Sequence, residues 1–364
     1  MFMIGLPNTG NNCWLNATLQ ALCGIDRFVD SLEAISSSNV NDMLTIEMAK
    51  TVRNMESNSR ISSLSKLLML CTSNFKFRMG QQQDASEFLI MFMNHICDKL
   101  EKAHNHQLLT DFKTSFEMQI RNRNQCMYMR HMMSEVDQGF YVIPISYEDW
   151  GSVWDSIQDF FAEEIIASCP SACEANKHVN ECTSVECESC RRRVGVTIQK
   201  EIRRLPNVLI LQLQIFQLIE GRSVVTDKQL NYDVMFTQSL DFLSRFCNAS
   251  AKDNCPSYQL KSVILHQGQS SFCGHYNAIS MRNKKWYYFN DDESPRYLED
   301  PSRFLLTHNH MHPYVLIYVD CSGSDEATDF AGKPTIVKSM SRISLKDLDE
   351  NGMFLYTSLL RFNV

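Results

Sequence analysis

The sequence predicts an α+β fold, in which a mainly helical N-terminal third precedes a strand-rich remainder. Apolar residues that recur every three or four positions indicate one helix from Cys13 and another after Asp84, and residues 36–80 between them are only loosely helical in pattern. Segments rich in β-branched and aromatic residues indicate strands at 140–146, 207–213, 258–266, 275–281, 285–290 and 314–319. We therefore expect the functional site to lie between a helical lobe and a sheet lobe.

The two predicted helices have recognisable beginnings. Leu15, Leu19 and Leu22 share one inward face of the first helix, which places Cys13 in its first turn. The second helix begins with the capping-box spacing Asp84-Ala85-Ser86-Glu87. An acidic side chain at this position accepts hydrogen bonds from the free backbone N–H groups of the first turn. We therefore expect Asp84 to cap this helix.

Composition argues against several classes of protein. A net charge of −7 over 364 residues argues against nucleic acid as the main partner, because phosphate binding needs an excess of Lys and Arg. No run approaches the ~18 consecutive apolar residues of a membrane span. The N-terminal segment lacks the basic flank and apolar run of a secretory signal or transit peptide. Because a chain of this size needs no disulfide scaffold, its 14 cysteines favour free thiols, and we expect a cytoplasmic or nuclear protein that binds no membrane.

The first helix and the loop before it contain groups suited to thiol chemistry. A thiolate is the attacking species, and the positive end of the helix dipole favours a thiolate at Cys13. The loop from Gly5 to Gly10 leads into the helix at this residue, and the Asn8 amide is placed to donate to an oxyanion. Taken singly, Cys13 is more simply a buried cysteine and Asn8 a turn residue. Their common setting favours a catalytic role.

A predicted hairpin near the other end of the chain supplies a histidine. A three-residue turn at 282–284 places His275 opposite Asp291 and Tyr276 opposite Asn290. An Asn or Asp that accepts the imidazole Nδ1–H leaves Nε2 to meet the thiol, as in a Cys-His-Asn triad. A histidine alone at a strand edge needs no catalytic role. Together with the cysteine on the first helix, it predicts a thiol protease.

These motifs together resemble the ubiquitin-specific protease family of cysteine deubiquitinases. The family's cysteine, central and histidine boxes and two of its strands are similar to residues 5–20, 82–89, 266–291, 205–211 and 313–318. The resemblance covers residues 4–320 and implies a papain-like cysteine protease fold with a helical thumb, a β-rich palm and fingers. We expect residues 321–364 to form a tail outside this catalytic domain, because the composition becomes linker-like after Asp320.

The resemblance implies a deubiquitinase, a thiol-dependent hydrolase that cleaves the isopeptide or peptide bond after the C-terminal Gly of ubiquitin. It assigns Cys13 as nucleophile, His275 as general base and Asn290 as third member of the triad. It also assigns Asn8 to the oxyanion hole and Asp291 as a neighbouring acidic residue that supports catalysis. Ubiquitin and ubiquitinated proteins are the implied partners, and catalysis requires no cofactor. The alternatives are a protease for another ubiquitin-like modifier and a catalytically silent ubiquitin-binding scaffold.

Four further residues are candidates for binding the ubiquitin tail. In relatives, the acidic residues that match Asp84 and Glu87 contact the arginine-bearing C-terminal tail of ubiquitin. A role for Asp84 as a helix cap is compatible with this contact. Tyr276 and Phe216 are candidate walls of the narrow channel for the terminal Gly-Gly, with packing in the core as the alternative for both.

Relatives often carry a zinc site in the fingers, built from two Cys-x-x-Cys pairs. Here Cys187 and Cys190 match one pair, whereas the other position has Cys126 followed by Met129. A thioether is a poor zinc ligand beside thiolates and imidazoles. The resemblance therefore predicts an incomplete metal site.

Other donors are available to complete the site. His131 or Cys182 can replace the missing ligand. A second or rearranged site has enough donors in one group of residues, Cys169, Cys173, His178 and Cys182. Structural zinc is thus one expectation, and reduced thiols on a finger loop are the alternative.

Overall fold

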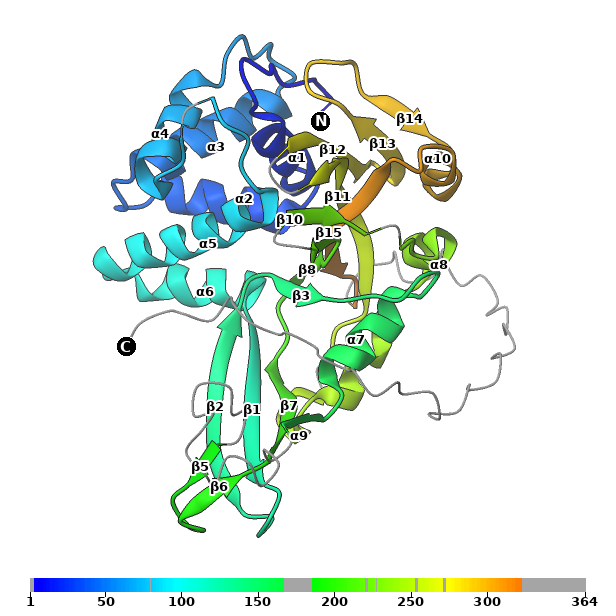
Figure 1. Cartoon of the computed structure of the whole chain (residues 1–364). Helices are drawn as coiled ribbons and strands as arrows, with labels where there is room; N and C mark the ends of the chain where they lie inside the picture. The colour runs from blue at the N-terminus through cyan, green and yellow to red at the C-terminus, as the bar shows by residue number, and fades with distance from the viewer. Residues whose placement is uncertain are drawn as a thin grey trace. The chain divides into compact units, whose positions relative to one another are not determined.

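The computed structural model describes residues 3–78, 80–166, 185–219, 222–226, 228–252, 255–270 and 273–322. The chain divides into two units, Met1–Ala327 and Thr328–Val364, and the described residues belong to the first. Its helical lobe, the expected thumb, consists of α1 (Cys13–Leu22), α2 (Asp26–Ser36), α3 (Met43–Glu56), α4 (Ser65–Phe75), α5 (Ala85–Lys102) and α6 (His106–Phe116) (Figure 1). Strands dominate the chain after α6, so the predicted segregation of helices and strands is present.

The region of loose helical pattern, residues 36–80, forms α3 and α4. Asp42 caps α3, because its carboxylate accepts the Thr45 N–H at 2.9 Å. The inner faces of these helices are buried, including Leu44 and Leu67. Tertiary packing thus stabilises helices that their own sequences indicate only weakly.

A seven-stranded sheet forms the expected palm, and its strand order is β14-β13-β12-β11-β15-β8-β3. The strands are β3 (Ile143–Ile145), β8 (Val208–Leu213), β11 (Tyr258–Ser270), β12 (Cys273–Arg282), β13 (Lys285–Phe289), β14 (Arg296–Leu298) and β15 (Met311–Asp320). Only the β3 and β8 pair is parallel among these neighbours. All six segments predicted as strands overlap strands of this sheet. Helix α1 packs against β12 and β11, which brings the two lobes together.

A second sheet, the expected fingers, extends away from the helical lobe (Figure 1). Its strand order is β2-β1-β7-β4, and a hairpin of β5 and β6 lies near its far end. The strands are β1 (Met118–Cys126), β2 (Met132–Phe140), β4 (Glu164–Ile166), β5 (Val185–Cys187), β6 (Arg192–Val194) and β7 (Val196–Arg204). Sequence patterns did not indicate β1 or β2, because both are largely polar. Cross-strand ion pairs such as Arg121 with Asp137 replace apolar packing there.

Smaller elements complete the described part of the chain. A two-stranded sheet pairs β9 (Phe216–Ile219) with β10 (Arg222–Val225). The remaining helical segments are α7 (Val153–Phe161), α8 (Tyr232–Thr237), the 3₁₀ helix η2 (Asp241–Phe246), α9 (Ala249–Lys252) and α10 (Pro301–Thr307). Most of the buried side chains belong to one core, which is continuous between the helices and the seven-stranded sheet.

The hairpin of β12 and β13 differs from its prediction by one residue. Arg282, not Met281, pairs with Lys285, so the turn has two residues instead of three. Those residues, Asn283 and Lys284, have φ angles of 50° and 61°. Positive φ at both positions is the geometry of a tight turn whose twist matches that of the strands, which is why it is favoured over the longer turn.

Candidate functional site

Cys13 is the first residue of α1, and strands of the palm hold the C-terminal end of this helix. At the C-terminal end, the Ser262 hydroxyl donates to the carbonyl of Ala21 at 2.9 Å, and the buried Arg282 guanidinium donates to the carbonyl of Gln20. These side chains come from β11 and β12 and satisfy carbonyls that the helix leaves free. The palm sheet thus fixes the helix that carries the thiol.

The loop before Cys13 is attached to the segment just after β13. The Leu6 N–H donates to the Asp291 carbonyl at 2.6 Å. A Cβ atom at Gly5 would lie 2.5 Å from the carbonyl carbon of Asp292, so only glycine permits this approach. The cysteine loop and the end of the histidine hairpin are therefore in direct contact.

The His275 ring lies between Cys13 and Asn290. Its Nε2 is 2.7 Å from Asn290 Oδ1, and the Cys13 side chain is near enough to the ring to raise the pKa of His275. Because an amide oxygen only accepts, Nε2 carries the proton, and Nδ1 is the nitrogen left for the thiol. The expected ring orientation, with Nε2 toward the thiol, was therefore wrong. The three residues predicted as a triad are nevertheless brought together.

The surroundings of His275 favour its protonated form. The hydrogen bond with Cys13, the bond with Asn290 and the negative charges of Cys13 and Asp291 outweigh partial burial and raise the pKa of His275 to about 9. Near neutral pH the imidazolium is therefore the main form of this ring. An imidazolium beside a thiol stabilises the thiolate, which is the reactive species.

Asp291 connects the two halves of the site through its carboxylate. Oδ2 accepts from Asn8 Nδ2 at 2.8 Å and lies 3.8 Å from His275 Nε2, whereas Oδ1 accepts from Asn16 Nδ2 at 2.7 Å. The Asn8 side chain is exposed, and its second amide hydrogen is not used in this bond. Sequence reasoning did not single out Asn16. The spacing of four from Asn12 to Asn16, on the helix that carries Cys13, was the available signal.

Asp84 and Glu87 begin α5 at the edge of the helical lobe. Asp84 Oδ1 accepts from the N–H groups of Ser86 and Glu87 at 2.8 and 2.9 Å, so the predicted cap is present. Its Oδ2 accepts from the Tyr314 hydroxyl at 2.6 Å, which links α5 to β15. Glu87 is exposed, and partial desolvation and the charge of Asp84 raise its pKa. Glu87 is thus the more available carboxylate of the two.

The two candidate channel residues lie in one aromatic cluster. Phe216 is half-buried, and its ring centroid is 5.1 Å from that of His266 and 5.4 Å from that of Tyr314. Tyr276 is only 1% exposed and lies 5.0 Å from His266 by ring centroids. Phe216 therefore offers surface to a ligand, whereas Tyr276 supports the cluster from within.

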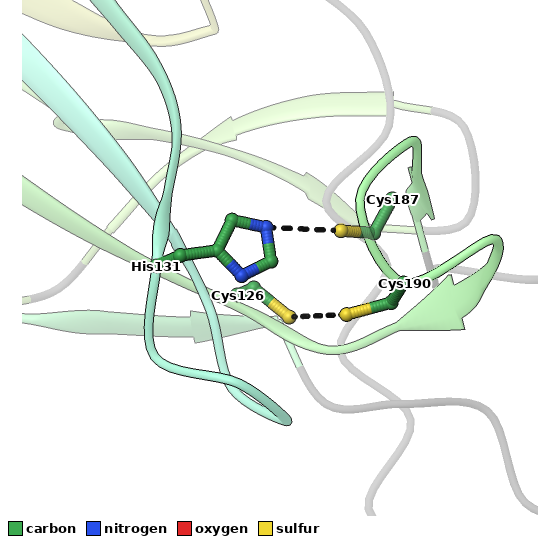
Figure 2. A group of neighbouring side chains, drawn as sticks. All are labelled: Cys126, His131, Cys187 and Cys190. Atoms are coloured by element: carbon green, nitrogen blue, oxygen red, sulfur yellow. Dashed lines mark hydrogen bonds between the residues drawn. The ribbon is translucent and has the colours of Figure 1, made fainter.

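Four side chains of types that can bind a metal lie close together in the fingers (Figure 2). The donor atoms of Cys126, His131, Cys187 and Cys190 all lie within 4.8 Å of one another. The Cys126 and Cys190 sulfurs are 3.7 Å apart, and Cys187 Sγ is 3.3 Å from His131 Nε2. Four sulfurs at the usual zinc distance form a tetrahedron with edges of about 3.8 Å, so this donor set fits zinc.

His131, one of the two substitutes considered for the missing ligand, is the residue that the fold brings to this site. It comes after the Cys126 turn at the start of the return strand, and the Cys126 N–H donates to its carbonyl at 3.0 Å. The other candidates, Cys169, Cys173, His178 and Cys182, lie outside the described residues. Met129 is 64% exposed and contributes its backbone N–H to Cys126 Sγ at 3.5 Å.

A thiol and an amide that both interact with one imidazole are the groups of a thiol-dependent hydrolase of the cysteine protease type. A family model described as "Ubiquitin carboxyl-terminal hydrolase" matches residues 4–318. The chain therefore belongs to the ubiquitin carboxyl-terminal hydrolase family, the cysteine-type deubiquitinases, as its motifs predicted. Within the described residues, no helix is long and apolar enough to cross a membrane.

Similar proteins agree with this assignment. Ubiquitin carboxyl-terminal hydrolase 36 of Drosophila grimshawi is 28% identical over 320 residues, covering 80% of this chain and 23% of that protein. Its counterpart in Drosophila mojavensis is 27% identical, covering 80% of this chain and 24% of that protein. The chain thus spans about a quarter of the length of these curated relatives.

A solved structure confirms the predicted fold. A chain in the structure of the SAGA Ubp8/Sgf11/Sus1/Sgf73 DUB module bound to ubiquitin aldehyde has a TM-score of 0.66 and 20% identity. The likeness covers 88% of this chain and 70% of that chain. The α+β, papain-like fold of the ubiquitin-specific protease type, with thumb, palm and fingers, is therefore present here.

Proposed function

We propose that this chain hydrolyses the isopeptide or peptide bond after the C-terminal Gly of ubiquitin through a thioester at Cys13. The observation that carries the proposal is the continuous contact from Cys13 through His275 to Asn290. The presence of ubiquitin aldehyde in the similar structure supports ubiquitin as the substrate. Ubiquitin and ubiquitinated proteins are thus the proposed partners, and no cofactor takes part in the reaction.

The geometry suggests how each step proceeds. The Cys13 thiolate attacks the Gly carbonyl carbon, and the oxyanion that forms accepts the second N–H of Asn8. The His275 imidazolium then gives a proton to the departing amine, which leaves a thioester at Cys13. Water attacks the thioester while His275 takes its proton, and the thiolate is released. Asn290 keeps the ring in position, and Asp291 orients the amide of Asn8.

The ubiquitin tail is proposed to pass between α5 and the palm. Glu87, as an exposed carboxylate, is suited to bind an arginine side chain of the tail. Asp84 has both oxygens engaged by α5 and Tyr314, so its main role is to position this helix. Phe216 forms a wall of the channel, and Tyr276 supports that wall from the core.

We further infer that residues 4–320 form the catalytic domain and that residues 321–364 are a separate tail. The family match over residues 4–318 supports the bounds of the catalytic domain. The acidic net charge supports a protein that does not bind nucleic acid. Free thiols at Cys13 and at ten other described positions suit the proposed cytoplasmic or nuclear location.

A ubiquitin probe with an electrophilic C-terminus tests the proposed function. The natural chain should gain the mass of one probe molecule in intact-mass spectrometry, and Cys13→Ala should gain none. The same measurement with probes made from ubiquitin-like modifiers distinguishes the first alternative. A folded chain that reacts with a modifier probe but not with ubiquitin would contradict the assigned substrate, and one that binds ubiquitin without reacting would be a silent scaffold.

We also propose that Cys126, His131, Cys187 and Cys190 hold a structural zinc ion that fixes the end of the fingers. Three thiolates and one imidazole are a common structural zinc set. Cys126 and His131 lie at the turn between β1 and β2, and Cys187 and Cys190 lie at the turn between β5 and β6. A bound ion would therefore join β1 to the β5–β6 hairpin. The site is separate from the catalytic residues and supplies no step of the reaction.

Metal analysis of the purified chain tests this site. We expect elemental mass spectrometry to find one zinc per chain, because the four donors already lie close together. Loss of a residue that only supports a metal ligand costs about 10–100-fold in metal affinity. His131→Ala removes a proposed ligand itself, so it should weaken zinc binding by more than this and should lower Tm. Met129→Ala is the matched control and should retain the metal. Zinc content that survives His131→Ala would rule out the histidine as a ligand.

A further inference from the structure

Asn16 is a buried amide on the helix that carries the nucleophile. It lies three residues after Cys13 and is 1% exposed. Its Nδ2 donates to Asp291 Oδ1 at 2.7 Å and to the Leu6 carbonyl at 3.1 Å, and its Oδ1 accepts from Asn12 Nδ2 at 3.0 Å. Both amide hydrogens are therefore used.

The partners of Asn16 come from three segments of the active site. Leu6 belongs to the cysteine loop, Asn12 precedes the first turn of α1, and Asp291 lies just after the histidine hairpin. The Asp291 carboxylate bridges two amides, because Oδ1 accepts a hydrogen bond from Asn16 and Oδ2 accepts one from Asn8. The N–H groups of Gly10 and Asn12 hold the oxygen of the Asn8 amide, and its nitrogen is held by Asp291, whose position depends on Asn16.

Asp291 needs such support, because its backbone is strained. Its φ angle is 44°, in the left-handed region that residues with a Cβ seldom adopt. The surrounding contacts must maintain this conformation. The Leu6 N–H holds the carbonyl of Asp291 and Asn16 holds its side chain, so the two bonds together fix the residue.

We propose that Asn16 is a positioning residue for the oxyanion hole: it fixes the Asp291 carboxylate, which in turn aims the free N–H of Asn8 at the developing oxyanion. The inference rests on the proposed function, since it assigns a role within that reaction. Donors that are fixed before the substrate binds need no reorganisation during the reaction, and loss of one such donor costs about 100–1,000-fold in kcat.

A pair of ubiquitin substrates separates this role from a merely structural one. Hydrolysis of a fluorogenic C-terminal amide develops an oxyanion. Alkylation by ubiquitin with a C-terminal 2-bromoethylamide does not, because the thiolate forms a C–S bond at a saturated carbon and bromide leaves. Asn16→Asp replaces the donor with an acceptor that faces Asp291. We expect its kcat for hydrolysis to fall about 100-fold while its alkylation rate stays within about threefold of the natural chain.

Controls accompany this comparison. Thr18→Ser changes another buried polar side chain of α1, whose hydroxyl donates to the Trp14 carbonyl of the same helix, and should leave both rates unchanged. Asn16→Ala removes the amide without adding charge and carries the comparison if Asn16→Asp unfolds. Thermal unfolding is measured for each variant.

A double substitution gives an independent readout. In Asn16→Asp with Asp291→Asn, the new carboxylate can accept from the new amide, so the donor and acceptor are exchanged. The double variant should hydrolyse the amide substrate at least about tenfold faster than Asn16→Asp, although the Leu6 carbonyl loses its donor in both variants. A structural defect at Asn16 would instead be deepened by the second change.

The outcomes are distinct. Selective loss of hydrolysis, with partial recovery in the double variant, supports the proposal. An equal fall of hydrolysis and alkylation in the folded Asn16 variants overturns it, because Asn16 would then hold the thiol or the tail and not the oxyanion donor. Absence of both reactions in the natural chain would overturn the proposed function itself, and the role of Asn16 with it.

Discussion

Replacing Cys13 with alanine is expected to abolish hydrolysis of ubiquitin substrates, with a fall in kcat of at least about 100,000-fold. In the proposed reaction this sulfur forms the thioester, and alanine at this position offers no atom that can replace it. The thiol is 3% exposed, so its removal leaves the surface of the site nearly unchanged. Ubiquitin binding should therefore persist. Steady-state hydrolysis of a fluorogenic ubiquitin amide and a binding titration with ubiquitin measure the two effects.

A second cysteine provides the control for this prediction. Cys273 is exposed on β12, two residues before His275, and its sulfur lies 3.2 Å from the Ser270 hydroxyl. Cys273→Ser should retain hydrolysis within about threefold, because this thiol has no part in the contacts from Cys13 to Asn290. Turnover that survives Cys13→Ala but is lost in Cys273→Ser would show that the nucleophile has been assigned to the wrong residue.

Replacing His275 with alanine is expected to lower kcat/KM at least about 10,000-fold and to change the shape of the pH profile. In the natural chain, activity should fall at acid pH as the thiolate and imidazolium pair takes up a proton. It should also fall as pH rises through about 9, because the imidazolium that protonates the leaving amine is lost. In His275→Ala the residual rate should rise continuously with pH as the isolated thiol ionises. Measurements of kcat/KM across this range test the assignment.

Asn290 gives the matched variant for this profile. The bond from His275 Nε2 to Asn290 is one of the contacts that raise the pKa of the ring, so Asn290→Ala should shift the alkaline limb to lower pH. An alkaline limb that persists in His275→Ala would show that another group controls it.

The raised pKa of His275 also affects the stability of the fold. Its contribution to the free energy of unfolding is complete below the ordinary histidine pKa of about 6.5 and disappears as pH rises through about 9.

The recognisable motifs of the sequence predicted most of the residues that meet in the candidate site. Cys13 begins α1 as expected, and Asp84 caps α5 as expected. His275 and Asn290 meet although the hairpin turn was assigned three residues instead of two. The wrong turn length did not affect this prediction, because Asn290 comes after the last paired residue of β13. At that point the pairing with β12 no longer sets the position of the chain.

Other parts of the site were beyond sequence reasoning. The orientation of the His275 ring depends on which nitrogen reaches Asn290, and no spacing in the chain determines that choice. The fingers strands β1 and β2 were missed because their cross-strand ion pairs leave little apolar alternation. The selection of His131 as the fourth candidate ligand depended on how the Cys126 turn folds.

The sequence by itself determined the elements whose signals lie within a few residues: the helix that begins at Cys13, the cap at Asp84 and the hairpin that carries His275. Only the tertiary structure decided that Asn16 and Asn8 share the carboxylate of Asp291. Helix periodicity and capping act between near neighbours, so a local pattern records them. A hydrogen bond between groups more than 270 positions apart in the chain, as from Asn16 to Asp291, depends on where packing places the donor and the acceptor.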